Sequence, residues 1–288
     1  FHDARYPERL KTIPSAPPLL FVRGDPDFLQ LPQLAMVGSR TPTASGRKTA
    51  HEFARHLSQA GITITSGLAR GIDAASHQGA LECLAGTLAL VAHGLDIVYP
   101  AEHRKLAEAI SRNGAVVSEH PIGTRPLKAY FPRRNRLISG LSLGTLVVEA
   151  ALGSGSLITA KHALEQGREI FAIPGSIHNP LARGCHRLIR QGAKLVETAD
   201  DILEELSALL PTELPRQPEV RSGEENQSSQ ALDPDHQKLL KCLAYEPLPI
   251  DELVDRSGFA ASEVASMLLI LELEGCVVSE SGRYTRVA

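Results

Sequence analysis

Short apolar runs alternate with segments of helical periodicity between residues 34 and 197. In the first helical segment, residues 50–57, apolar side chains fall at positions i, i+3, i+4 and i+7 and share one face. The runs between the helical segments are apolar throughout, which is typical of strands in a parallel sheet covered by helices on both faces. The pattern predicts a Rossmann-like, doubly wound and mostly parallel α/β sheet. We expect its strands at 34–38, 62–66, 87–92, 115–118, 145–149, 169–173 and 194–197.

Composition divides the chain into four parts. Residues 1–33 are rich in proline and predict an irregular lead-in packed on the main domain. Residues 34–210 contain the strand and helix alternation and are expected to form the Rossmann-like domain. Residues 211–231 hold Pro, Ser, Glu and Gln with almost no large apolar side chain, which is typical of a flexible linker. Residues 232–288 form a small C-terminal domain.

This C-terminal segment has a different pattern. Apolar side chains at helical spacing predict three helices, near residues 239–243, 250–255 and 261–274, and Ser262 is the expected N-cap of the third. Two β-like pieces, 276–280 and 283–287, follow and are joined by a Ser-Gly turn. Three helices and a hairpin of this size predict a winged-helix domain.

Composition excludes several classes of protein. Hydrophobic residues make up 43% of the 288 residues, and no apolar run approaches the roughly 20 residues of a membrane-spanning helix. There is no secretory signal in the sequence. The four cysteines, Cys83, Cys185, Cys242 and Cys276, lack the short spacing of a zinc site or a redox pair. We therefore expect free thiols in a soluble, cytoplasmic protein without a metal site or a membrane partner.

The formal net charge of −3 conceals an asymmetry. Residues 1–210 carry 23 Lys and Arg against 19 Asp and Glu, a net charge of +4. Residues 232–288 carry 5 against 10, a net charge of −5. Binding of a polyanion is therefore expected in the large domain, because phosphate neutralisation needs positive charge. The third helix of the winged-helix domain has no Lys or Arg, so we do not expect it to read DNA.

Glycine-rich turns follow several of the predicted strands. Such turns let backbone amides approach an anion, and several of them along one edge of a parallel sheet favour a ligand with several phosphates. None of them matches a dinucleotide fingerprint or a P-loop, so we expect no nucleotide cofactor. The turn residues predicted to bind are Gly38, Ser39 and Arg40, Gly67 and Arg70, Ser154, Gly155 and Ser156, and Gly175.

The most distinctive segment, residues 128–136, reads KAYFPRRNR. Guanidinium groups bind phosphates, and aromatic rings stack on unpaired bases. Basic groups beside aromatic rings suit single-stranded DNA better than duplex, since the bases of a duplex are already paired and stacked. The candidate DNA-binding residues here are Lys128, Phe131, Arg133, Arg134, Asn135 and Arg136.

No catalytic set of residues stands out, so we expect a protein that is not an enzyme. Glu149 ends a predicted strand and is a candidate buried carboxylate at the pocket. Asp73 is expected to cap a helix, and His77 to be a structural residue held by hydrogen bonds. Asp96 and Glu119 are isolated in the sequence.

Six ordered strings together resemble the DprA/Smf family of DNA-processing proteins over about residues 30–200. They are GSR at 38–40, SGLARGID at 66–73, HGLDIVYP at 93–100, FPRRNRLISGLS at 131–142, VVEAALGSGSLITAKHALEQGR at 147–168 and PGSIHNPLARGCHRLIRQGA at 174–193. The lead-in is similar to the family's YPxxL segment, beginning at Tyr6, and many members carry a winged helix.

The resemblance implies a protein that binds single-stranded DNA, protects incoming DNA and loads RecA recombinase in natural transformation. It also implies a homodimer formed through the Rossmann-like domain. By the same resemblance, Arg40, Lys128 and Phe131 line the DNA pocket together with the glycine turns. Arg70, Arg134, Asn135 and Arg136 are further members of that pocket.

Two other hypotheses remain open at this point. Residues 144–149, GTLVVE, are faintly similar to the PGGxGTxxE string of nucleotide phosphoribohydrolases, although the leading Pro-Gly-Gly is missing. An enzyme on a related Rossmann-type fold is therefore the alternative. A third hypothesis makes the winged helix the functional part and the large domain a scaffold that senses a nucleotide.

Overall fold

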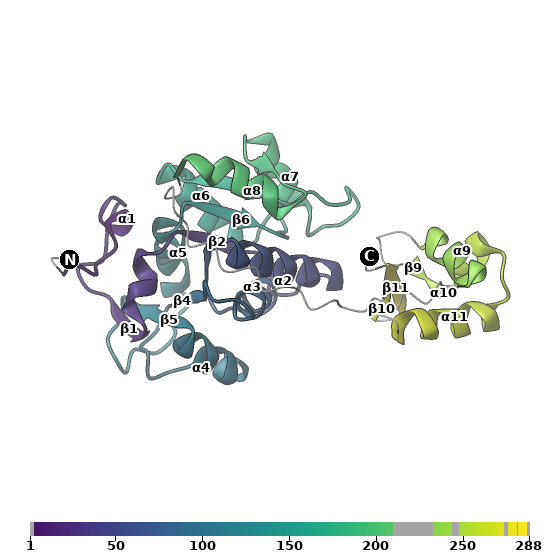
Figure 1. The fold of residues 1–288 in the computed structure, drawn as a ribbon, viewed down its shortest axis with the longest axis horizontal. Coiled ribbons are helices and arrows are strands. Elements are labelled where there is room, and N and C mark those ends of the chain that lie inside the picture. The colour runs from purple at the N-terminus through teal and green to yellow at the C-terminus, as the bar shows by residue number, and fades with distance from the viewer. Residues whose placement is uncertain (1–2, 210–232, 244–247, 274–275, 281, 287–288) are drawn as a thin grey trace. The chain divides into compact units, whose positions relative to one another are not determined.

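The computed structural model describes residues 3–209, 233–243, 248–273, 276–280 and 282–286. The chain separates into two compact units, Phe1–Pro218 and Glu219–Ala288, which are described here one at a time (Figure 1). The predicted linker 211–231 lies outside the described residues.

An eight-stranded sheet forms the centre of the first unit, and its strand order is β1-β5-β4-β3-β2-β6-β7-β8. Neighbouring strands from β5 to β8 are parallel, which confirms the predicted Rossmann-like fold. All seven predicted strands are present, with ends shifted by one or two residues. The strands are β1 Phe21–Gly24, β2 Gln33–Val37, β3 Thr63–Ser66, β4 Thr87–Val91, β5 Gly114–Ser118, β6 Gly144–Val147, β7 Glu169–Ala172 and β8 Lys194–Leu195.

The prediction of an irregular lead-in is wrong in part. Strand β1 lies in this segment and pairs antiparallel with β5, with Phe21 opposite Ser118. Hydrophobic spacing did not reveal β1, because it is a short edge strand whose side chains are only half-buried. The lead-in does pack on the main domain, since Tyr6, Leu10 and Ile13 are buried in its core.

Helices cover both faces of the sheet (Figure 1). Successive residues of β2 alternate between the faces: Leu34 and Met36 pack with α2, α3 and α8, whereas Ala35 and Val37 pack on the side of α1, α5, α6 and α7. Helix α4 packs over β4 and β5. The helices are α1 Glu8–Lys11, α2 Ala44–Gln59, α3 Ile72–Ala80, α4 Arg104–Arg112, α5 Tyr130–Leu141, α6 Ser156–Glu165, α7 Arg183–Arg190 and α8 Ala199–Leu206, with 3-10 turns at Pro26–Gln30, Ala101–His103 and Ser207–Leu209.

The strand order reverses between β2 and β6, which are neighbours in the sheet although more than a hundred residues separate them in the chain. In open α/β sheets, ligands bind in the crevice beyond the carboxyl ends of the strands at such a switch point. Arg40 follows β2 and Glu149 follows β6, so both lie at this point.

The second unit has the predicted winged-helix architecture. Helices α9 (Pro234–Cys242), α10 (Ile250–Ser257) and α11 (Ala261–Leu273) enclose an apolar core, and a small sheet has the order β10-β11-β9. Its strands are β9 Leu248–Pro249, β10 Val277–Glu280 and β11 Arg283–Arg286. The predicted N-cap Ser262 is wrong, because Ser262 lies inside α11. The Glu263 carboxylate instead accepts a hydrogen bond from the amide of Ala260 at 2.9 Å.

A buried histidine joins α3 to the sheet. His77 Nδ1 lies 2.7 Å from the Thr87 hydroxyl, which in turn donates to the carbonyl of Ile64. Burial lowers the pKa of His77 to about 3, so the ring is neutral at physiological pH. The structural role predicted for His77 is confirmed.

Candidate nucleic-acid interface

Three side chains from distant parts of the chain meet beyond the carboxyl ends of the strands. The guanidinium carbon of Arg40 lies 5.9 Å from the centre of the Phe131 ring, within the range of a cation–π contact. The ring of Tyr99 lies 5.7 Å from that of Phe131, centre to centre. Arg40 is exposed and Phe131 is half-buried, so a cation and aromatic rings face solvent together.

The loop that carries Arg40 is fixed by Glu149. Both carboxylate oxygens of Glu149 accept hydrogen bonds from Thr43, one from the amide at 2.9 Å and one from the hydroxyl at 2.6 Å. The backbone carbonyl of Glu149 accepts from the amide of Ser39 at 2.7 Å. Glu149 is buried, as predicted, and it holds residues 39–43 where α2 begins.

The glycine turn after β3 already contains a bound carboxylate. The amides of Gly67 and Ala69 donate to Asp73 Oδ2 at 3.1 and 3.3 Å. The prediction that Asp73 caps its own helix is wrong, because α3 begins after Gly71 without a side-chain cap. Asp73 therefore occupies amides that the glycine-turn hypothesis assigned to phosphate.

Arg134 lies beneath this turn and is 4% exposed. A Cβ built on Gly67 would collide with Arg134 Nη1 and would lie 2.8 Å from Asp73 Oδ2, so the two charged groups border the space that a side chain at position 67 would fill. Burial lowers the pKa of Arg134 to about 10, while the charge of Asp73 opposes this shift. Arg134 thus remains protonated at neutral pH and is structural, in contrast to the exposed phosphate contact expected from sequence.

Residues 133–136 lie in the first half of helix α5, and the helix turns their side chains in different directions. Arg136 points inward and forms an ion pair with Glu119 at 2.6 Å, with both side chains about nine-tenths buried. Asn135 donates to the carbonyl of Gly155 at 3.4 Å. Arg133 and Lys128 are exposed. Lys128 and Arg133 therefore keep the accessibility that the prediction requires, whereas Arg134 and Arg136 do not.

Arg70 is exposed but paired. Its guanidinium donates two hydrogen bonds to the Glu102 carboxylate, at 2.7 and 2.6 Å. An exposed pair of this kind contributes little stability, so phosphate can compete for Arg70.

The remaining predicted turns lie after β6 and β7. The hydroxyls of Ser154 and Ser156 lie 2.7 Å apart at the start of α6, beside exposed Gly155. Gly175 is exposed, and its carbonyl lies 2.9 Å from His186 Nε2. Gly38 leads out of β2, where a Cβ would collide with Ile72, so its role is close packing.

Sequence reasoning missed Tyr99, which is 49% exposed. The signal was present, since Tyr99 is the penultimate residue of the string HGLDIVYP, which lies just beyond a strand. Its loop is tied to the next one, because Asp96 accepts from the amide of Gly123 at 2.9 Å and Gly94 donates to Thr124 at 2.9 Å. Asp96 and Glu119, isolated in the sequence, thus both fix segments around the site.

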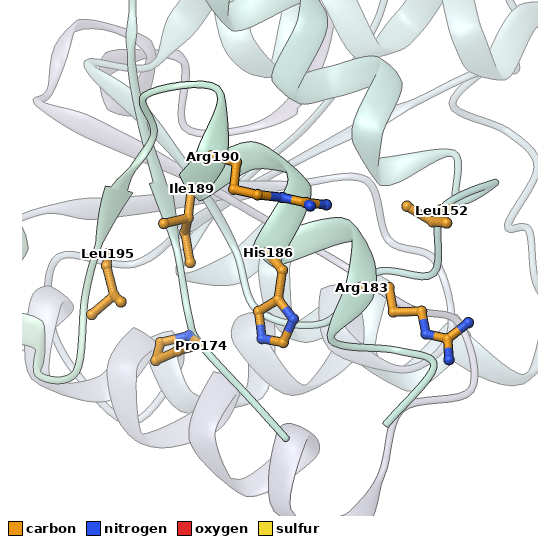
Figure 2. Close-up of a pocket in the computed structure, with 7 residues that line it drawn as sticks. All are labelled: Leu152, Pro174, Arg183, His186, Ile189, Arg190 and Leu195. Atoms are coloured by element: carbon orange, nitrogen blue, oxygen red, sulfur yellow. The ribbon is translucent and has the colours of Figure 1, made fainter. Parts of the chain in front are cut away.

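An apolar groove lies on α7 of the same unit. A cavity of about 620 Å³ is flanked by α7 and β8, and apolar side chains line it beside two arginines (Figure 2). A second cavity, of about 850 Å³, is lined by residues of α6 and of the other side of α7. The first is lined by Leu152, Pro174, Arg183, His186, Ile189, Arg190 and Leu195.

Within the described residues, no group of three or more His, Cys, Asp or Glu side chains is placed to hold a metal ion. In the same residues, no helix is long and apolar enough to cross a membrane. None of the four cysteines, which all lie in the described part of the chain, forms a disulfide, and burial raises the pKa of Cys185 to about 12.

The fold and this site define an α/β protein with a winged-helix domain and a cation–aromatic cluster at the switch point of its sheet. Residues 1–207 match the family described as DNA recombination-mediator protein A, and residues 223–283 match the DprA winged helix domain. The chain therefore belongs to the DNA recombination-mediator protein A family, whose members are DNA-processing proteins and not known enzymes.

Relatives of known name agree with this assignment. Protein Smf of Escherichia coli K12 is 45% identical over 283 residues, which cover 98% of this chain and 75% of the relative. The crystal structure of DNA processing protein A from Streptococcus pneumoniae matches with a TM-score of 0.68 at 46% identity, covering 70% of this chain and 71% of that one. A structure of the Helicobacter pylori protein, described by its single-stranded DNA binding mode, matches with a TM-score of 0.66 at 28% identity, covering 71% and 94%.

The packing at Gly67 gives a stability prediction. We expect Gly67→Ala to lower the free energy of unfolding by about 2 kcal/mol, because the added methyl group collides with the buried guanidinium of Arg134 and displaces it. Urea denaturation of the whole chain measures this. Gly153→Ala is the matched control, since nothing lies within 4 Å of its added Cβ, and its stability should stay within about 0.5 kcal/mol of wild type. Equal stability of the two variants would contradict the assigned role of Arg134.

Proposed function

We propose that this protein binds single-stranded DNA at the cluster of Arg40, Phe131, Lys128 and Arg133. The observation that carries the proposal is the exposed guanidinium of Arg40 beside the Phe131 ring at the switch point of the sheet. A guanidinium group binds phosphate, and an aromatic ring beside it stacks on an unpaired base. Lys128 just before α5 and Arg133 within it add exposed positive charge.

The buried residues of the predicted set have a different part in this proposal. Arg136, through its ion pair with Glu119, and Arg134, which is buried beside Gly67, position α5 and with it Phe131. A charge reversal at Arg134 consequently reports on folding, and Arg40 is the better residue for testing DNA contact.

Replacing Arg40 tests the proposal directly. We expect Arg40→Gln to weaken binding of oligo-dT about tenfold at low salt, because one charge-assisted phosphate contact is lost. The slope of log affinity against log salt should decrease by about 0.7, as for one phosphate on a single strand. Fluorescence anisotropy across a salt series measures both.

The matched control is Arg55→Gln, which removes the same charge from an exposed position on α2, away from the cluster. It should leave affinity within about twofold and the slope unchanged. If both variants behave like wild type, the site assignment is wrong.

The enzyme hypothesis has weaker support. Residues 144–149 are the string that is similar to nucleotide phosphoribohydrolases, and an enzyme of that kind would need the Glu149 carboxylate to contact the substrate. Both of its oxygens are already bound to Thr43, and the side chain is buried. We therefore propose a binding protein, and incubation with nucleoside monophosphates should release no base.

We further propose that the protein acts in the cytoplasm, where it protects incoming DNA and loads RecA recombinase on it during transformation. Membership in the family supports this role. We expect the wild-type protein to shorten the lag of RecA filament formation on DNA coated with single-strand-binding protein. Arg40→Gln should lose this effect in the same assay, and a variant as active as wild type would contradict loading through the DNA site.

The homodimer expected from the family is proposed to form through the α7 groove. Leu152 and Leu195, which line the groove, are 51% and 44% exposed. Leu164 on α6, which lines the second cavity, is 68% exposed and extends the apolar patch. In a two-fold symmetric dimer, one such patch covers the same patch of the partner and buries these side chains.

A charge placed in this groove tests the dimer. We expect Leu195→Glu to raise the dimer dissociation constant at least about a hundredfold, because each interface would bury two unpaired carboxylates. Sedimentation equilibrium measures the constant. Leu84→Glu, at a site that is 80% exposed outside the groove, is the control and should dimerise like wild type. Dimerisation of the Leu195 variant with wild-type affinity would exclude this face.

The winged helix is not included in the proposed DNA site. The described face of α11 carries Glu263 and Glu272 with exposed Leu269, Ile270 and Leu273, and it offers no cation to a phosphate. This surface is suited to contact with protein rather than with DNA.

A further inference from the structure

Tyr99 is a large aromatic side chain that the fold leaves about half exposed beside Phe131. Its environment is held firmly: the His103 ring lies 3.0 Å from the carbonyl of Leu68, and Arg23 donates to the carbonyl of Leu95 at 3.1 Å. Together with the Asp96 contact to Gly123, these bonds fix both sides of the loop. Tyr99 is therefore presented to solvent on a defined support and does not serve the core.

The geometry of the two rings restricts what they can bind. Their centres lie 5.7 Å apart, within the range of two rings in contact, so a base does not fit between them. Each ring can stack only with a base on its outer side. The ring planes are inclined by 54°, so two bases stacked in this way are inclined to each other by a similar angle.

Arg40 and Arg70 frame the pair of rings. Arg40 lies over Phe131, and Arg70 is bound to the carboxylate of Glu102, which follows Tyr99 by three residues. A nucleotide at each ring would thus have a guanidinium within reach of its phosphate. Each of the two nucleotides would thus contact one aromatic ring and one guanidinium group.

We propose that Tyr99 and Phe131 stack on two successive bases of one DNA strand and hold these bases out of parallel. Binding thereby unstacks a dinucleotide step. The inference rests on the proposed function and extends it, since it explains selection against duplex DNA: paired bases in a duplex stay parallel and cannot be splayed without unpairing.

An adjacent pair of 2-aminopurine bases, placed at each position in turn along a short oligo-dT, tests the inference. Stacked neighbours of this base give an exciton band in circular dichroism that disappears when the two bases separate. With saturating wild-type protein, we expect the exciton band to disappear when the 2-aminopurine pair occupies one particular position along the oligomer. Persistence of the band at every position, with the oligomer bound, would overturn the inference and leave the proposed function intact.

Variants of Tyr99 give the second arm of the test. We expect Tyr99→Leu to bind oligo-dT about tenfold more weakly with an unchanged salt slope, since stacking releases no counterions. The exciton band should survive in its complex. Tyr99→Phe keeps the ring and should behave as wild type in both measurements. Equal affinity of wild type and Tyr99→Leu would overturn the inference, whereas a wild-type protein that binds no oligo-dT overturns the proposed function and the inference together.

Discussion

The edge at which we propose that DNA binds depends on two buried and opposite charges, the Arg134 guanidinium and the Asp73 carboxylate, which lie near each other beside Gly67. A buried charge is costly unless an opposite charge compensates it, and removal of one group leaves the other uncompensated. The two groups link the turn after β3 and the start of α3 to the first half of α5. Because Phe131 and Arg133 also lie in that half of α5, their positions follow from packing that solvent does not reach.

Glu149 fixes the position of the neighbouring loop, residues 39–43. Its carboxylate and its carbonyl together hold residues 39–43, so Arg40 leaves the sheet from a fixed point. The molecule thus uses acidic side chains, Asp73, Glu149, Asp96 and Glu119, to organise a surface on which the exposed groups are cations and rings. A site built in this way is largely formed before a ligand arrives, which reduces the entropy lost on binding.

The sequence predicted the sheet well, because strands that are apolar on both faces leave a strong signal. It also pointed to the edge of the sheet at which we propose that DNA binds, since Gly, Ser and Arg follow the strands. It did not predict which arginines are buried. Residues 133–136 look like a uniformly basic loop, and only the start of α5 at Tyr130 sends Arg134 and Arg136 inward while Arg133 stays outside. Strand β1 escaped prediction for a different reason, as four half-buried residues at a sheet edge carry no clear periodicity.

The antiparallel strand β1 has a consequence for how the chain assembles. Its partner β5 lies about ninety residues further along, and Leu10 and Ile13 pack against Gly140 of α5. During synthesis, the segment from Tyr6 to Gly24 has no surface on which to dock until the ribosome has released residues beyond 140. Contacts this distant in sequence form late and slow the folding of a domain. The lead-in is therefore synthesised before the central strands but docks after them. Pairing of β1 with β5 then adds the last strand at that edge of the sheet.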